Sequence, residues 1–121
     1  MPSDPRLGAP LSEAEVEEAL GQGIALFDAG AFWEAHEAWE TGWHRAPPTE
    51  RDLFQGLIHA AAACLHHSRG NGWGLHRQRE RMRRRLGRFG SRHRGIDLAR
   101  LVAAVEALEA GVDAAYPRLG P

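Results

Sequence analysis

The residues best suited to chemistry lie in one short run, AFWEAHEAWETGWH, which spans positions 31–44. On a helix, steps of three and four place residues on one face, and this run has such a face in Trp33, His36, Glu40 and Trp43. A neutral imidazole and a carboxylate four residues apart can bind the same metal ion. The adjacent Glu37 can add an oxygen or orient the histidine ring. The run therefore predicts half of a metal site.

The other half has to come from a second segment, and residues 50–69 contain the candidates. Their polar side chains at helical spacing are Gln55, His59 and His66, with His67 beside them. If the two helices pack antiparallel, these groups can meet His36 and Glu40 inside the bundle. We predict His36, Glu40 and His66 as metal ligands, and Glu37 or His67 as the general base that activates water. Mixed nitrogen and oxygen donors suit zinc, manganese, iron or nickel without selecting one.

The same pair also has a purely structural interpretation. A histidine and a glutamate beside tryptophans can form a buried hydrogen-bond network in which every polar group is satisfied. The compact motif of two histidines flanking a glutamate, typical of zinc proteases, is absent from the sequence. Spacing alone leaves both interpretations open.

The pattern of apolar residues predicts the elements that position these groups. Ser12 and Glu15 form a capping box, and helical periodicity follows over about 12–29, 31–46, 49–69, 73–89 and 98–110. Residues 90–95 are expected to be a basic loop, and we find no strand pattern. We predict an all-α five-helix antiparallel bundle with one domain over residues 12–112, a flexible arm over 1–11 and a tail over 113–121.

A weak internal repeat supports two related helical hairpins followed by a C-terminal helix. Its first copy, Gly30, Trp33, His36 and Glu40, returns 40 residues later as Gly70, Trp73, His76 and Glu80. Both copies stand at the start of the second helix of a predicted pair. The match covers four positions, so chance is the rival explanation.

The chain resembles an uncharacterised bacterial and archaeal family called domain of unknown function 309. The similarity rests on GAFWEAHEAWETGW followed by LFQGLIHAAAACLHHSRGN, within residues 20–86. The family's pattern of a histidine, three residues, an acid, two residues and an aromatic is matched by His36, Glu40 and Trp43. The resemblance implies a small all-α domain and a metal-binding role, and it implies no substrate.

Charge is distributed unevenly along the chain. Residues 1–68 hold eleven acids and three arginines, whereas residues 69–94 hold ten arginines and one acid. We expect the arginines to form a solvated or salt-bridged face turned toward the acidic half, within one chain or in a homo-oligomer, and we rank RNA binding third. A non-catalytic interaction module is the second reading. No secretion signal or apolar run of about 18 residues is visible, which predicts a cytoplasmic protein with no membrane contact.

Overall fold

The computed structural model describes residues 9–113 and 115–120, and its helices confirm the predicted all-α fold. The helices are α1 (Glu13–Asp28), α2 (Phe32–Trp43), α3 (Arg51–Ser68), α4 (Gly72–Leu86) and α5 (Leu98–Glu109). A 3₁₀ turn (Gly87–Phe89) and two short strands, β1 (Arg92–His93) and β2 (Ile96–Asp97), connect α4 to α5. Most of the predicted arm over residues 1–11 lies outside the described residues, as do positions 114 and 121 of the predicted tail.

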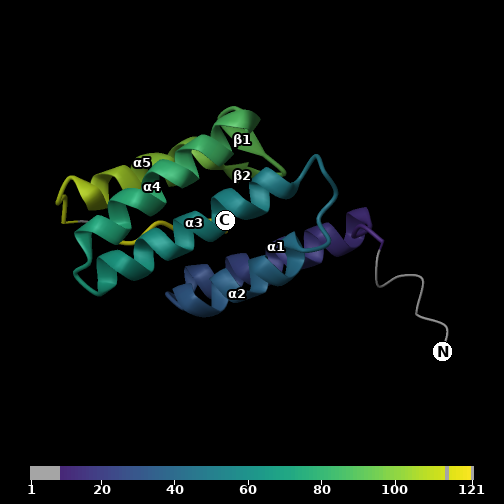
Figure 1. The fold of residues 1–121 in the computed structure, drawn as a ribbon, viewed down its shortest axis with the longest axis horizontal. Helices are drawn as coiled ribbons and strands as arrows, with labels where there is room; N and C mark the ends of the chain where they lie inside the picture. Colours follow the sequence, from purple (N-terminus) through teal and green to yellow (C-terminus); the bar gives the residue numbers. More distant parts are fainter. Residues whose placement is uncertain (1–8, 114, 121) are drawn as a thin grey trace.

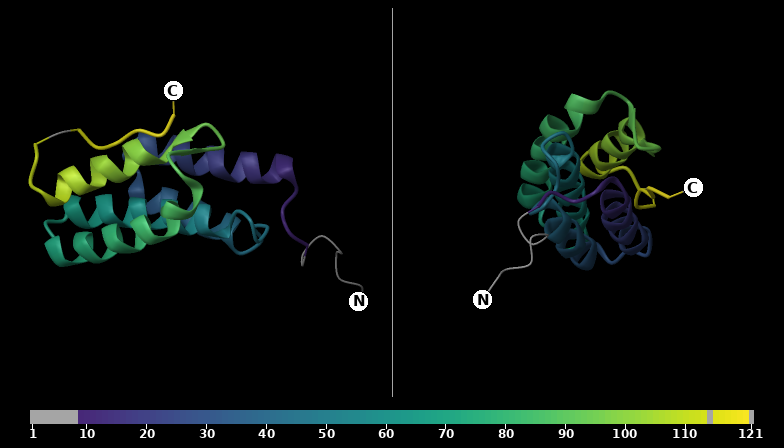
Figure 2. Two further views of the ribbon diagram at one scale, coloured as in Figure 1. Left: turned by 90° about the horizontal axis from the view of Figure 1, so that it is seen from above. Right: turned by 90° about the vertical axis from the view of Figure 1, so that its right-hand side faces the viewer.

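Helix α3 lies in the middle of the molecule, with the α1–α2 hairpin on one side and α4 and α5 on the other (Figure 1). Successive helices run in opposite directions, so α2 and α4 begin at the same end of the bundle (Figure 1). Seen nearly along their axes, the helices pack around one core (right panel of Figure 2). Helix α3 therefore packs against both α2 and α4.

The start of α1 shows the predicted capping box. The backbone N–H of Glu15 donates to the Ser12 hydroxyl, and the Ser12 N–H donates to the Glu15 carboxylate. Two of the free amides in the first turn are thereby satisfied. Helix α1 then buries Val16, Leu20 and Phe27 in the core.

Trp39 fills the contact between α1 and α2. Its side chain is fully buried and its indole N–H donates to the Leu20 carbonyl over 3.3 Å. Gly23 makes this possible, because a Cβ at that position would lie 2.0 Å from the indole nitrogen. A side chain well off the His36 stripe therefore joins the two helices of the first hairpin.

The segment expected to be a basic loop contains a small antiparallel hairpin, in which Arg92 pairs with Asp97 and His93 with Ile96. Arg94 occupies the turn with a φ of 52°, a conformation that few residues other than glycine adopt. Its guanidinium bonds to three carboxylates that lie far away in the sequence, those of Glu13, Glu17 and Glu50. These long-range ion pairs fix a turn that has no periodic signal in the sequence.

In the described residues, the arginines of α4 and of the following 3₁₀ turn pair with Asp52 of the acidic half and with α5, rather than with α1 or α2. Arg79 and Arg83 of α4 pair with acids of α5, whereas Arg85 of α4 and Arg88 of the 3₁₀ turn pair with Asp52 of α3. The neighbours of α4 in the bundle are α3 and α5, so its ion pairs form there. The acidic face of α1 is instead reached by Arg94.

The extended segment after α5 runs back across the bundle (left panel of Figure 2). The Tyr116 hydroxyl shares a hydrogen bond of 2.8 Å with His67 Nδ1, and the Tyr116 ring packs on Phe32. The backbone N–H groups of Leu119 and Gly120 donate to the Asp28 carboxylate. The segment thus contacts α1, α2 and α3.

Candidate functional site

The two hairpins repeat one local structure at the turn between their helices. Gly30 and Gly70 have φ values of 80° and 70°, the left-handed conformation that ends a helix. In both turns the residue after the glycine donates its backbone N–H to the carbonyl five residues earlier. These hydrogen bonds run from Ala31 to Leu26 and from Asn71 to His66. The sequence repeat therefore corresponds to a repeated helix–turn–helix structure.

The same likeness extends to the side chains that follow each turn. Trp33 stacks on His36 with ring planes 6° apart, and Trp73 stacks on His76 with planes 24° apart. Each histidine has a glutamate four residues later, at 3.6 Å for His36 and 3.3 Å for His76. The first tryptophan of each hairpin is 51% and 70% exposed, respectively.

The two histidines differ in whether the next helix provides a hydrogen-bond partner for the ring Nδ1. His76 Nδ1 bonds to the Glu109 carboxylate of α5, which also accepts from Arg79 Nε over 2.6 Å. These bonds from Arg79 and His76 hold the pKa of Glu109 below its usual range, against the opposing effect of burial. His36 Nδ1 is buried without a hydrogen-bond partner. Of the two equivalent imidazoles, the one in the first hairpin retains an unused nitrogen.

His36 lines a hollow of about 280 Å³ between α2 and α3. The walls of this hollow are His36, Glu40, Trp43, Gln55, Ile58 and His59. The indole N–H of Trp43 is also buried without a partner, while the Arg51 guanidinium lies 4.4 Å from the centre of its ring. We call this hollow the His36 pocket. It combines two unsatisfied buried nitrogens with a carboxylate and an amide.

His59 forms the boundary between the His36 pocket and helix α4. Its Nδ1 shares a hydrogen bond of 2.8 Å with the Gln78 side chain. Burial is the main effect that lowers the pKa of His59, and the positive charges of Arg81 and Arg85 lower it further, against the opposing hydrogen bond. His59 is therefore held as a neutral ring at neutral pH.

A second hollow of about 230 Å³ begins on the other side of His59. Its lining consists of Gln55, His59, Arg81, Arg84 and Arg85. Gln55 and His59 line both hollows, so these side chains lie between the two spaces. We call the second one the arginine hollow.

The predicted ligands and bases lie in three places. His36 and Glu40 face the His36 pocket, whereas His66 lies at the α3–α4 turn, 3.1 Å from the Asn71 amide and against Gly74. His67 contacts Tyr116 of the C-terminal segment. Glu37 lines a shallow hollow that it shares with Glu40, Thr41 and His44.

Geometry along α3 explains why His59 rather than His66 lines the pocket. Seven residues of helix separate them, which is roughly 10 Å of rise. His59 and His66 lie on the same face of α3, but only His59 lies beside His36 and lines the pocket with it. Within residues 9–113 and 115–120, no three His, Cys, Asp or Glu side chains converge closely enough to hold one metal ion.

Residues 20–78 match the family model described as "Domain of unknown function (DUF309)". The resemblance to the DUF309 family is therefore confirmed. The matched segment runs from α1 to the first half of α4, and it includes the walls of the His36 pocket together with Gln78. A search of curated proteins finds no match to this chain. None of the helices in the described ranges has both the length and the apolar character needed to cross a bilayer.

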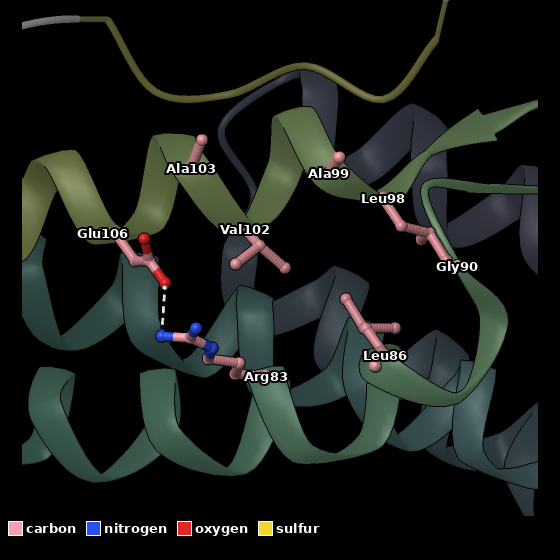
Figure 3. A pocket seen from close by; sticks show the side chains of 9 residues that line it. Arg83, Leu86, Gly90, Leu98, Ala99, Val102, Ala103 and Glu106 are labelled. Atoms are coloured by element: carbon pink, nitrogen blue, oxygen red, sulfur yellow. Dashed lines mark hydrogen bonds and ion pairs between the residues drawn. The ribbon is translucent and has the colours of Figure 1, made fainter.

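One more hollow lies outside the matched segment, between α4 and α5 (Figure 3). Leu86, Leu98 and Val102 form its apolar surface, and Arg83 pairs with Glu106 over 3.3 Å at one side (Figure 3). Its two charged residues already neutralise each other. This hollow lacks the unsatisfied donors that distinguish the His36 pocket.

Proposed function

We propose that the His36 pocket binds a divalent metal ion through His36 Nδ1 and Glu40. The supporting observation is that His36 Nδ1 is buried without a hydrogen-bond partner, 3.6 Å from Glu40 Oε2. That separation is too long for a hydrogen bond. It fits two atoms bound to one ion, because ligands about 2.1 Å from a tetrahedral metal are about 3.4 Å apart.

The remaining coordination positions would be filled from outside the His–Glu pair. The Gln55 side chain in the same pocket offers an amide oxygen, and water or a small molecule can take the rest. An ion with such open positions supplies Lewis acidity to whatever binds beside it. If the site is hydrolytic, Glu37 is the better candidate for the proton acceptor, since His67 Nδ1 already bonds to Tyr116.

Metal titration of the whole chain tests the proposal, with zinc as the probe. We expect about one ion per chain, a higher melting temperature with zinc, and an affinity reduced at least about tenfold in His36→Ala and Glu40→Ala. His76→Ala is the matched control, because its ring also follows a tryptophan by three residues and precedes a glutamate by four, but it bonds to Glu109. Equal zinc affinity in His36→Ala and His76→Ala, or no stoichiometric binding by the native chain, would overturn the proposal.

A second candidate function is self-association through the exposed tryptophans. Trp33 and Trp73 begin α2 and α4, which start at the same end of the bundle, and both rings are more than half exposed (Figure 1). Paired exposed aromatics suit a contact with another copy of the chain. Sedimentation of the native chain and of Trp33→Ala/Trp73→Ala tests this, and a native chain that stays monomeric at high concentration excludes it.

A further inference from the structure

The arginine hollow carries an excess of positive charge that the fold does not neutralise. In the described part of the chain, Arg81 and Arg84 have no carboxylate partner, and both side chains are exposed. Arg85 shares Asp52 with Arg88, at 3.0 Å and 2.9 Å. The hollow thus holds three guanidinium groups and no acid among its lining residues.

The unpaired arginines are confined to one side of α4. Arg79 and Arg83 face α5, and each is matched there by a glutamate at 2.6 Å and 3.3 Å. The side facing α5 has its charges neutralised within the fold, whereas the side facing the hollow leaves donors available to a ligand.

The donors in the arginine hollow suit a compact oxyanion. Guanidinium groups offer paired N–H donors that match phosphate oxygens, and such charge-assisted hydrogen bonds are stronger than neutral ones. Residues 81, 84 and 85 lie within about one helical turn, so their side chains can reach the same group. The Gln55 amide adds a neutral donor at the edge of the hollow.

We propose that Arg81, Arg84 and Arg85, together with Gln55, form a binding site for the phosphate group of a small molecule, with His59 at the edge of the site. The site requires no metal and is separate from the His36–Glu40 pair. Because Gln55 and His59 line both hollows, the rest of the ligand would extend past these side chains toward the His36 pocket. That part of the inference rests on the proposed function, because it brings the ligand beside His36 and Glu40.

Phosphate titration of metal-free protein, in chelator and at constant ionic strength, tests the site. Inorganic phosphate is the probe, and amide and His59 ring resonances in NMR spectra report its position. We expect saturable shifts around the arginine hollow and an affinity about tenfold lower or more in Arg81→Gln, because a charge-assisted hydrogen bond to phosphate is lost. Circular dichroism checks that the variant is folded.

Arg77→Gln is the matched control, because it removes the same charge from the same helix at an exposed position that does not line the hollow. Phosphate binding that persists in excess chelator separates this site from the metal proposal. Equal losses in the Arg77 and Arg81 variants would mean non-specific charge attraction and would overturn the inference. A ten-nucleotide RNA that binds more tightly than phosphate and depends equally on Arg77 would also overturn it, in favour of a nucleic-acid surface.

Discussion

His36 on α2 and His76 on α4 occupy equivalent positions 40 residues apart, yet only His76 Nδ1 is bonded to the next helix, through Glu109. At the level of His76, α5 supplies the carboxylate of Glu109, whereas the helix opposite His36 presents His59 and Gln55 instead of an acid. The histidine of the second hairpin therefore contributes to the stability of the fold, whereas the histidine of the first hairpin keeps a ring nitrogen without a hydrogen-bond partner.

Glu109→Gln should therefore destabilise the fold. It removes the charge that accepts hydrogen bonds from His76 and Arg79, so we expect the free energy of unfolding to fall by about 1–2 kcal/mol. Urea denaturation at pH 7 measures this. His36→Ala is the counterpart in the first hairpin and should change stability less than His76→Ala, because His36 Nδ1 makes no hydrogen bond. The reverse order would contradict the assigned difference between the hairpins.

Gly23→Ala should weaken the packing between α1 and α2 and lower the stability of the fold. The added Cβ would lie 2.0 Å from Trp39 Nε1, which has to shift with the whole buried indole, and such overpacking costs about 1–3 kcal/mol. Thermal unfolding with tryptophan fluorescence reports both the loss of stability and the movement of the ring.

Gly21→Ala provides the control on the same helix. A Cβ at Gly21 has no atom within 4 Å, so only the higher helix propensity of alanine acts there. We expect that variant to be more stable by about 0.5–1 kcal/mol. A similar response of the two variants would mean that the contact with Trp39 does not limit the packing.

The pKa of His59 predicts a dependence of stability on pH. Burial lowers the folded-state pKa below the unfolded value, so the unfolded chain binds more protons as the pH drops. The stability that a neutral His59 contributes is fully present above the unfolded pKa, about 6.5, and is lost as the pH falls through the folded pKa. Melting temperatures between pH 7.5 and 5 should therefore decline less in His59→Gln than in the native chain, whereas His44→Gln, at an exposed position, should follow the native profile.

The sequence predicts the helices well because their signals are local. The capping box of Ser12 and Glu15, the glycines at 30 and 70 and the apolar periodicity each act within a few residues of the chain. The placement of His36 and Glu40 on one face follows from the same local geometry. The repeat of four positions likewise corresponds to two hairpins of the same structure.

Which residues line the site depends on the position of α3 along the axis of α2, and no local feature of the sequence specifies that position. His59 and His66 share a stripe, so periodicity cannot say which of them stands level with His36. The sequence does not predict the Arg94 turn for a related reason, because its strained backbone is stabilised by carboxylates of α1 and of the residue that precedes α3. Both features depend on contacts between residues far apart in the sequence.

Asp28→Asn should release the end of the C-terminal segment. The Asp28 carboxylate accepts the N–H groups of Leu119 and Gly120 at 2.7 Å and 2.8 Å, and an amide side chain can replace only one of these acceptors. We expect amide exchange at both residues to accelerate about tenfold while α3 keeps its protection, because the loss is local. Glu18→Gln, an exposed change on the same helix, should leave exchange at both residues unchanged.

Arg94→Met tests whether the β1–β2 turn is held by the buried carboxylate of Glu50. Glu50 is only 6% exposed and relies on Arg94 and His93 for its hydrogen bonds. Removing the guanidinium leaves a buried charge with one partner, which costs about 3–5 kcal/mol when such a pair is broken. Urea denaturation should show this loss, whereas Glu13→Gln should change stability little, because the Glu13 carboxylate is exposed.

The double variant Arg94→Met/Glu50→Gln distinguishes the buried charge from the other contacts of Arg94. A neutral amide at position 50 no longer needs a cation, so the double variant should be more stable than Arg94→Met alone. The remaining difference from the native chain then measures the bonds to Glu13 and Glu17 together with the turn conformation. If the second substitution instead adds to the first, the turn is held by those exposed acids, and Glu50 is stabilised mainly by His93.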